Sequence, residues 1–193
     1  MARSQQPLEG KRIAILATDG VEEIEYTQPR ITAEQAGAEV YLISLAAGEI
    51  QAMNQDINPG NRLAVDRTVD QAQPSDYDAL VLPGGTVNPD RLRANSTAMA
   101  FVRAFFDQDK PVAAICHGPW SLVETGMVDG RTVTSYPSLR TDINNAGGLW
   151  VDREVQVDDG LLTSRRPADL PAFCDKLVEQ FAQGHPVGQL NLA

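Results

Sequence analysis

The chain has 193 residues and a formal net charge of −10, with 42% hydrophobic residues. This length suits one domain with a sizeable core. Nucleic acid and anionic membrane surfaces bind positively charged proteins, so the negative charge argues against both as partners. No apolar run approaches the length of a membrane span, and two cysteines are too few for a disulfide framework, so we expect a protein of the reducing cytoplasm.

Secondary structure is predicted from the hydrophobic pattern. The polar stretch at residues 1–10 is expected to be a flexible lead, and residues 11–193 a single domain, because no linker interrupts them. Asp19 and Glu22 have capping-box spacing, which predicts the start of the first helix. The expected strands are 12–17, 39–45, 76–82, 112–115, 131–134, 149–151, 154–157 and 161–164. The expected helices are 19–36, 88–93, 96–107, 120–125, 138–146 and 168–183.

Strands that alternate with helices indicate a parallel sheet covered by helices on both faces. The predicted fold class is therefore α/β, a three-layer sandwich with a mainly parallel, flavodoxin-like central sheet. Residues 46–61, between the second and third core strands, are polar and rich in Asn, Gly and Pro, and we expect only short strand-like pieces near Ile50 and Leu63–Val65.

Cys116 lies where a short apolar strand turns sharply into a helix, and Gly118 leaves room for a tight turn. Nucleophile elbows are built in this way. We expect a thiol exposed above a helix N-terminus, with a pKa below its ordinary value. The alternative is a buried structural cysteine, which is how we interpret Cys174 on the inner face of the last helix. His185 in the tail is expected to be exposed.

A nucleophilic thiol needs a base and an oxyanion hole. His117 is the only histidine nearby in sequence, although side chains of adjacent residues normally point apart. Gly84 and Gly85 end a strand that should neighbour the elbow, and the backbone N–H groups of Gly85 and His117 could stabilise an oxyanion. An ordinary turn is the alternative. We expect no metal and no cofactor, because no metal-ligand spacing, phosphate loop or dinucleotide fingerprint is present.

Four separated motifs resemble the PfpI family of intracellular cysteine hydrolases, relatives of the class I glutamine amidotransferases. In order they are DALVLPGG (78–85), AICHGPW (114–120), TSYPSLRTDINNAGGLWVD (134–152) and SRRPADLPAF (164–173). The resemblance runs from about Arg12 to Phe181 and implies a class I glutamine amidotransferase-like fold. It also implies that His117 serves Cys116 and that a glutamate, Glu25, lies against the thiol.

The resemblance further places Asp90 where many members carry the acid of a triad, and it allows Tyr136 to line the site. Asp90 is one methylene shorter than a glutamate, the usual acid at this position in the family. A solvated acid at the start of a helix explains Asp90 equally well. Tyr136 is equally well explained as a packed aromatic. Glu25 would have to be protonated to help, because an ionised carboxylate raises a neighbouring thiol's pKa. In the family the acid reaches into a neighbouring subunit, which implies a homodimer or larger assembly.

The leading hypothesis is a stress-protective cysteine hydrolase with Cys116 as nucleophile, acting on small peptides or on glycated and dicarbonyl-modified groups. A glutaminase would need a histidine on a later loop, and the matching stretch, SRRPAD (164–169), has none. The alternative from another class is a redox sensor or holdase chaperone without catalysis, whose Cys116 is oxidised to sulfenic acid.

Overall fold

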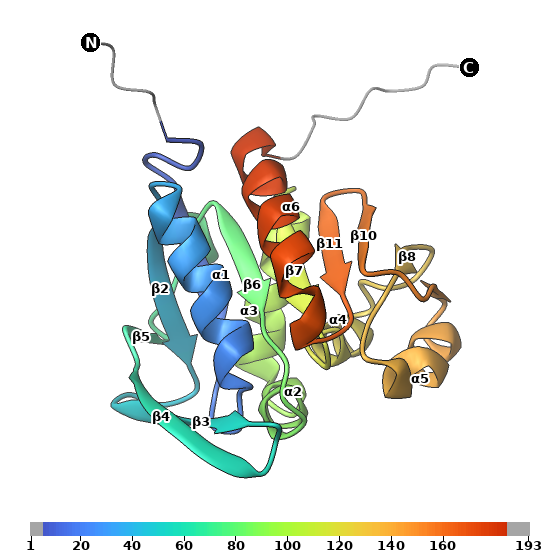
Figure 1. The fold of residues 1–193 in the computed structure, drawn as a ribbon, viewed down its shortest axis with the longest axis horizontal. Helices are drawn as coiled ribbons and strands as arrows, with labels where there is room; N and C mark the ends of the chain where they lie inside the picture. The colour runs from blue at the N-terminus through green and yellow to red at the C-terminus, as the bar shows by residue number, and fades with distance from the viewer. Residues whose placement is uncertain (1–5, 185–193) are drawn as a thin grey trace.

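Seven strands form the central sheet, in the spatial order β10-β11-β7-β6-β1-β2-β5. All neighbouring strands are parallel except β10 and β11, which form an antiparallel hairpin. The computed structural model describes residues 6–184 (Figure 1). The strands are β1 (Arg12–Leu16), β2 (Glu39–Ser44), β5 (Arg67–Thr68), β6 (Ala79–Leu82), β7 (Val112–Ile115), β10 (Val155–Asp158) and β11 (Leu161–Ser164).

The alternation of side chains along these strands produces three layers. Ile13 and Ile15 of β1 face a core shared with α1 (Glu23–Gln35) and α6 (Leu170–Gln183). Ala14 and Leu16 face the opposite core, which is closed by the remaining helices. Those helices are α2 (Val87–Arg93), α3 (Ser96–Asp107), α4 (Trp120–Thr125) and α5 (Arg140–Asn145), with the short 3₁₀ turns η1 (Pro74–Asp76) and η2 (Pro137–Leu139). A third turn, η3 (Pro167–Asp169), leads into α6. The predicted three-layer α/β fold is confirmed.

Two small sheets lie outside the central one. The polar segment after β2 is a regular antiparallel hairpin of β3 (Glu49–Asn54) and β4 (Asn58–Ala64), longer than the short pieces expected. β8 (Thr132–Val133) and β9 (Leu149–Trp150) pair with each other. Both were expected as strands, whereas β4 is exposed at most positions and so lacks the alternating hydrophobic pattern that predicts a strand.

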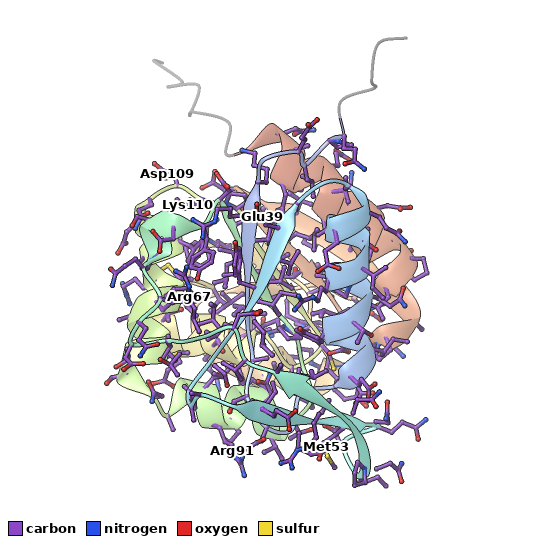
Figure 2. All side chains as sticks on the ribbon, turned by 90° about the vertical axis from the view of Figure 1, so that its left-hand side faces the viewer. Glu39, Met53, Arg67, Arg91, Asp109 and Lys110 are labelled. Atoms are coloured by element: carbon purple, nitrogen blue, oxygen red, sulfur yellow. The ribbon has the colours of Figure 1, made fainter. Side chains whose placement is uncertain are left out.

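The carboxyl ends of the parallel strands point toward one end of the molecule, where α2 and the β3–β4 hairpin also lie (Figure 1). Figure 2 labels Met53 on β3 and Arg91 on α2 at that same end, and Glu39, Asp109 and Lys110 at the other. The hairpin is joined to the start of α1 through the Met53 N–H, which donates to the Val21 carbonyl at 2.8 Å. Open α/β sheets bind ligands at this edge.

The first helix begins later than predicted and without the expected capping box. Its N-cap residue is Glu22, whose side chain makes no capping hydrogen bond. The Asp19 carboxylate instead accepts the Gln51 N–H at 2.8 Å, and the Glu22 carboxylate accepts the Gln55 N–H at 3.0 Å. Both acids therefore hold the β3–β4 hairpin, because backbone donors far away in sequence compete successfully for their oxygens.

The expected flexible lead needs a correction at Leu8. This side chain is fully buried in the α1–α6 core, and its N–H donates to the Ala36 carbonyl at 2.8 Å. Residues 6–10 are therefore part of the domain. Within residues 6–184, no helix is long and apolar enough to cross a membrane.

We predict that Leu8→Ala lowers the free energy of unfolding by about 2–5 kcal/mol, because it removes buried methyl groups and leaves a cavity. Urea unfolding followed by circular dichroism measures this. Ile57→Ala serves as the control, since Ile57 is 78% exposed and its truncation should change stability little. Equal midpoints for the two variants would show that residues 6–10 do not contribute to the core.

Candidate active site

Cys116 has a left-handed backbone conformation, with φ of 61°. This region is costly for a residue other than glycine and persists only where the surroundings impose it. Here the Cys116 N–H donates to the Ser164 carbonyl of β11 at 3.0 Å, and the Cys116 carbonyl accepts the Tyr136 N–H at 2.8 Å. The strand thus continues its sheet pairing through Cys116 and then reverses, which is the elbow predicted from the sequence.

Two glycines make room for this turn. A Cβ on Gly118 would lie 2.9 Å from the Ile115 carbonyl oxygen and would also collide with the Leu82 carbonyl. A Cβ on Gly84 would lie 2.7 Å from the Cβ of Cys116 and 2.9 Å from the backbone nitrogen of His117. Since β6 pairs directly with β7, the loop after β6 lies against the elbow, as expected.

The imidazole of His117 lies against the thiol. Its Nδ1 is 3.2 Å from the Cys116 Sγ, although adjacent side chains were expected to diverge. The left-handed turn at Cys116 brings the two together. The His117 ring stacks on Tyr136, with centroids 4.6 Å apart, and its Nε2 lies 3.3 Å from the Ser138 Oγ. Burial lowers the pKa of His117, and the charge of Asp56 opposes this shift. The ring is therefore neutral at neutral pH and can accept a proton.

Glu25 reaches the elbow from α1. Its side chain is fully buried, and its Oε2 accepts the Gly84 N–H at 2.8 Å. Burial raises the pKa of Glu25 to about 8, against the opposing effect of the Gly84 N–H and of a hydrogen bond with Cys116. The carboxyl group therefore holds its proton at neutral pH, the state in which it can donate to sulfur.

The thiol of Cys116 does not have the lowered pKa that the helix N-terminus suggested. Burial raises the pKa of Cys116, and a charged Glu25 raises it further. The backbone N–H groups of His117 and Gly85 act in the opposite direction, because both point at the sulfur. The loss of water around Cys116, a residue that is only 7% exposed, outweighs the partial charge of a six-residue helix.

A cavity of about 450 Å³ opens above the sulfur. It is lined by Cys116, His117, Glu25, Gly85 and Tyr136, all expected at the site, and by Glu22, Gln55, Asp56, Thr86 and Pro167, which were not. Gly84, also expected to line the site, does not line this cavity and contacts it through Glu25, whose carboxyl group accepts the Gly84 N–H. In the sequence Glu22 has the spacing of a capping-box acid, and Gln55 and Asp56 lie in a polar segment without a catalytic motif.

The tip of the β3–β4 hairpin forms one wall of the cavity. Gln55 and Asp56 both have positive φ, and the Glu22 carboxylate accepts both of their N–H groups, at 3.0 and 3.3 Å. Asp56 in turn accepts the Thr86 N–H at 2.6 Å. These bonds hold two acidic side chains, Glu22 and Asp56, at the mouth of the cavity.

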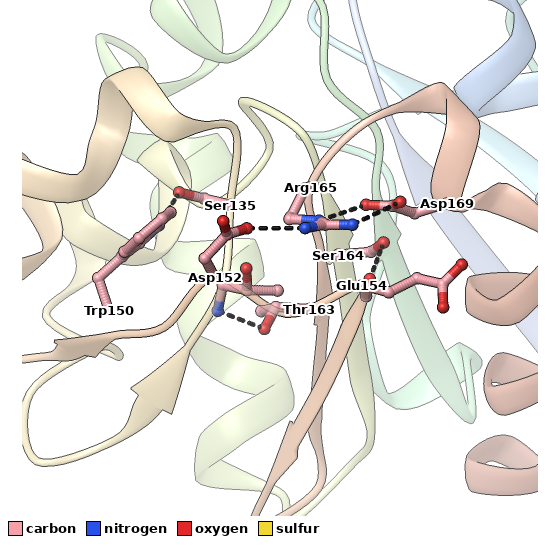
Figure 3. A network of polar contacts seen from close by, with 9 residues as sticks. Ser135, Trp150, Asp152, Glu154, Thr163, Ser164, Arg165 and Asp169 are labelled. Atoms are coloured by element: carbon pink, nitrogen blue, oxygen red, sulfur yellow. Dashed lines mark hydrogen bonds and ion pairs between the residues drawn. The ribbon is translucent and has the colours of Figure 1, made fainter.

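The opposite wall is held by Arg165, at the end of β11 (Figure 3). Its guanidinium donates to both oxygens of Asp169, at 2.8 and 3.0 Å, and to Asp152 at 2.7 Å. This fork–fork pair raises the pKa of Arg165 and fixes the turn η3, which carries Pro167. The stretch 164–169 therefore has a structural role in shaping the cavity.

Asp90 is exposed on α2 and does not line the cavity within one chain. Cys174 is buried against the α1–α6 core, in keeping with the structural interpretation. His185 lies outside the described residues. No group of three or more His, Cys, Asp or Glu residues that could hold a metal ion occurs between residues 6 and 184.

Comparison with known proteins finds relatives along most of this chain. The model of the DJ-1/PfpI family matches residues 11–180. A Pyrococcus horikoshii protein named as a deglycase is 40% identical over 168 residues, which cover 87% of this chain and 98% of that protein. General stress protein 18 of Bacillus subtilis is 43% identical over 165 residues, covering 85% and 94%. The crystal structure of Drosophila melanogaster DJ-1beta has a TM-score of 0.80 at 28% identity, covering 89% and 90%.

The buried carboxyl group of Glu25 predicts a pH-dependent stability. Its pKa is about 8 when folded and near 4.5 when unfolded, so between these values the unfolded chain has lost a proton that the folded chain keeps. Stability therefore falls as pH rises from about 4.5 to about 8 and changes little above this range for this group. Glu25→Gln, which keeps an acceptor for the Gly84 N–H, should gain a few kcal/mol over the wild type across that range.

Urea unfolding at a series of pH values between 4 and 9 measures this difference. Cys116→Ala is the control, because burial is the leading cause of the Glu25 shift and should persist without the thiol. Curves for Glu25→Gln and the wild type that stay parallel across the range would show that Glu25 ionises normally in the folded protein.

Proposed function

Since this chain belongs to the DJ-1/PfpI family, we propose that it is a cysteine hydrolase that uses Cys116 as its nucleophile. The observation that carries the proposal is the contact between Cys116 and His117, with Sγ and Nδ1 3.2 Å apart beneath an open cavity. A thiol and a base within reach of each other, with backbone donors aimed at the same point, are what attack on a carbonyl requires.

The geometry supports activation of the thiol during attack. The pKa of Cys116 is raised by burial and that of His117 is lowered, so the resting pair is a thiol beside a neutral imidazole. As Sγ bonds to the carbonyl carbon, its proton passes to Nδ1 of His117. The carbonyl oxygen becomes an oxyanion, which the N–H groups of His117 and Gly85 would stabilise.

With a peptide substrate, collapse of that intermediate breaks the C–N bond and expels the amine, which takes the proton from Nδ1 and leaves an acyl group on sulfur. Water then attacks the acyl carbon, with His117 again as base, and restores the thiol. Glu25, protonated at neutral pH, would donate to sulfur when negative charge forms there. Tyr136 keeps the imidazole in place through its stacking contact.

We further propose that the substrates are small peptides or glycated and dicarbonyl-modified groups, and that the role is protection against stress in the cytoplasm. The deglycase and general stress protein named above support this class. The cavity of about 450 Å³ suits a small molecule or one modified side chain. Both cysteines are free thiols, which a reducing compartment would preserve.

The test is a panel of methylglyoxal, methylglyoxal-modified amino acids and short peptides. We expect wild-type protein to turn over at least one of them and Cys116→Ala to lose at least a thousandfold in rate, since the nucleophile is gone. Cys174→Ala is the matched control, because it removes the other cysteine and should keep the activity.

The same panel separates the hydrolase from a redox sensor or holdase chaperone. A sensor would form no product from any of these substrates, yet mild peroxide would add one or two oxygens to Cys116, as intact mass and peptide mapping would show. That combination would reject the hydrolase in favour of the sensor.

We also propose a homodimer or larger assembly in which Asp90 of the partner subunit approaches His117. Asp90 is exposed on α2, close in sequence to Val87, an apolar residue that is 42% exposed. An exposed acid cannot orient a buried histidine of its own chain from outside the cavity, but a closed assembly could bring it to a neighbouring site and repeat the contact symmetrically.

Mixing two impaired variants tests this shared site. Asp90→Ala should lower activity and Cys116→Ala should abolish it, while a dimer containing one of each has one complete site. Random exchange should therefore restore about a quarter of the wild-type activity, because half of the dimers are mixed and each has one working site of two. Asp90→Glu should stay active. A monomer at working concentration, or a mixture no more active than its parts, would leave Asp90 as a surface acid.

A further inference from the structure

The imidazole of His117 has a polar partner at each nitrogen. Nδ1 faces the Cys116 sulfur at 3.2 Å, and Nε2 faces the Ser138 hydroxyl at 3.3 Å. Ser138 lies in the turn η2, two residues after Tyr136, whose ring covers one side of the imidazole with planes inclined by only 24°.

The turn that carries Ser138 is fixed to the rest of the protein. Leu139, next in sequence, is fully buried in the core, and its N–H donates to the Tyr136 carbonyl at 3.0 Å. The Tyr136 N–H donates to the Cys116 carbonyl, so the turn is bonded to the elbow itself. On its other side the Ser135 hydroxyl accepts the Trp150 indole N–H at 3.0 Å (Figure 3). Ser138 is therefore presented to His117 by a rigid segment.

The number of protons on the imidazole determines which atom donates in each of these two hydrogen bonds. A neutral imidazole has one N–H and one lone pair. If Nδ1 is to take the thiol proton, its lone pair must face sulfur, and Nε2 must hold the hydrogen and donate it to Ser138. After the transfer both nitrogens hold hydrogens, so Ser138 must again accept. The Ser138 oxygen thus serves as acceptor in both states, and nothing has to rotate between them.

We propose that Ser138 is a positioning residue that fixes the Nε2–H tautomer of His117 and stabilises the imidazolium. The inference rests on the proposed role of His117 as base. In the step it supports, the Sγ–H bond breaks and the Nδ1–H bond forms, so a thiolate–imidazolium pair replaces a neutral pair and no other reactant is needed. The serine hydroxyl changes neither its proton nor its charge.

Nitrogen NMR of the protein labelled at histidine tests this directly. The chain has only two histidines, His117 and His185, so the spectrum is simple, and a His185→Gln variant assigns it. We expect the wild type to show a protonated Nε2 and an unprotonated Nδ1 at His117. Ser138→Ala should shift both nitrogens toward the values of a tautomer mixture, and Ser138→Thr, which keeps the hydroxyl, should restore the wild-type pattern.

The rate of Cys116 alkylation by iodoacetamide at neutral pH is the second readout. It should fall about three- to tenfold in Ser138→Ala, the effect of one hydrogen bond to a charged group that water partly replaces, and recover in Ser138→Thr. Ser75→Ala is the matched control, since it removes an exposed hydroxyl from another 3₁₀ turn, η1, which does not line the cavity. Circular dichroism and thermal unfolding of each variant verify that it is folded.

A wild-type spectrum with the hydrogen on Nδ1 would overturn the inference. So would a Ser138→Ala protein that is folded and matches the wild type in both spectrum and alkylation rate. If Asp90→Ala rather than Ser138→Ala changed the spectrum, the acceptor would be the acid of the partner subunit. Neither readout needs a substrate, so failure of the substrate panel would count against the proposed function without deciding the role of Ser138.

Discussion

The site depends on one strained residue, Cys116, whose backbone turns left-handed at the end of β7. If the chain continued as a strand, the side chains of Cys116 and His117 would point to opposite faces of the sheet. The positive φ instead brings Nδ1 to the sulfur and directs the His117 N–H at the same atom. The strain persists because sheet pairing to Ser164 and the bond from Tyr136 hold Cys116 on both sides.

The second constraint is the exclusion of water around this turn. Burial raises the pKa of Glu25 and of the Cys116 thiol and lowers that of His117, so all three groups rest in neutral forms. Burying neutral groups costs little free energy. When a proton moves from one of these groups to another, a positive and a negative charge form together. A reactive thiolate is therefore not the resting state. The thiolate forms only when the His117 imidazole accepts the thiol proton, so the reactivity of Cys116 depends on the position of the imidazole.

The walls of the cavity come from segments far apart in sequence, held by bonds between carboxylates and backbone N–H groups. The Glu22 carboxylate accepts hydrogen bonds from the backbone of Gln55 and Asp56 at the hairpin tip. The Asp56 carboxylate accepts one from the backbone of Thr86 in the loop after β6. On the other side Arg165 and Asp169 fix the turn with Pro167. The acidic rim gives the cavity mouth a negative character, consistent with the charge of the whole chain.

The sequence by itself determined the layers, the strand-to-helix elbow and the position of Cys116 at that elbow. These features depend on local periodicity and on residues that are contiguous in the chain. The pairing of neighbouring strands placed Gly85 at the elbow, since parallel strands bring their carboxyl ends to one edge, and the family resemblance placed Glu25 there. The tertiary structure decided the rest. The thiol pKa is governed by burial, which sums contributions from many segments, and Glu22 and Ser138 have their partners 33 and 21 residues away. Such contacts have no local signature, because they form only when a turn on one segment meets a donor or acceptor on another.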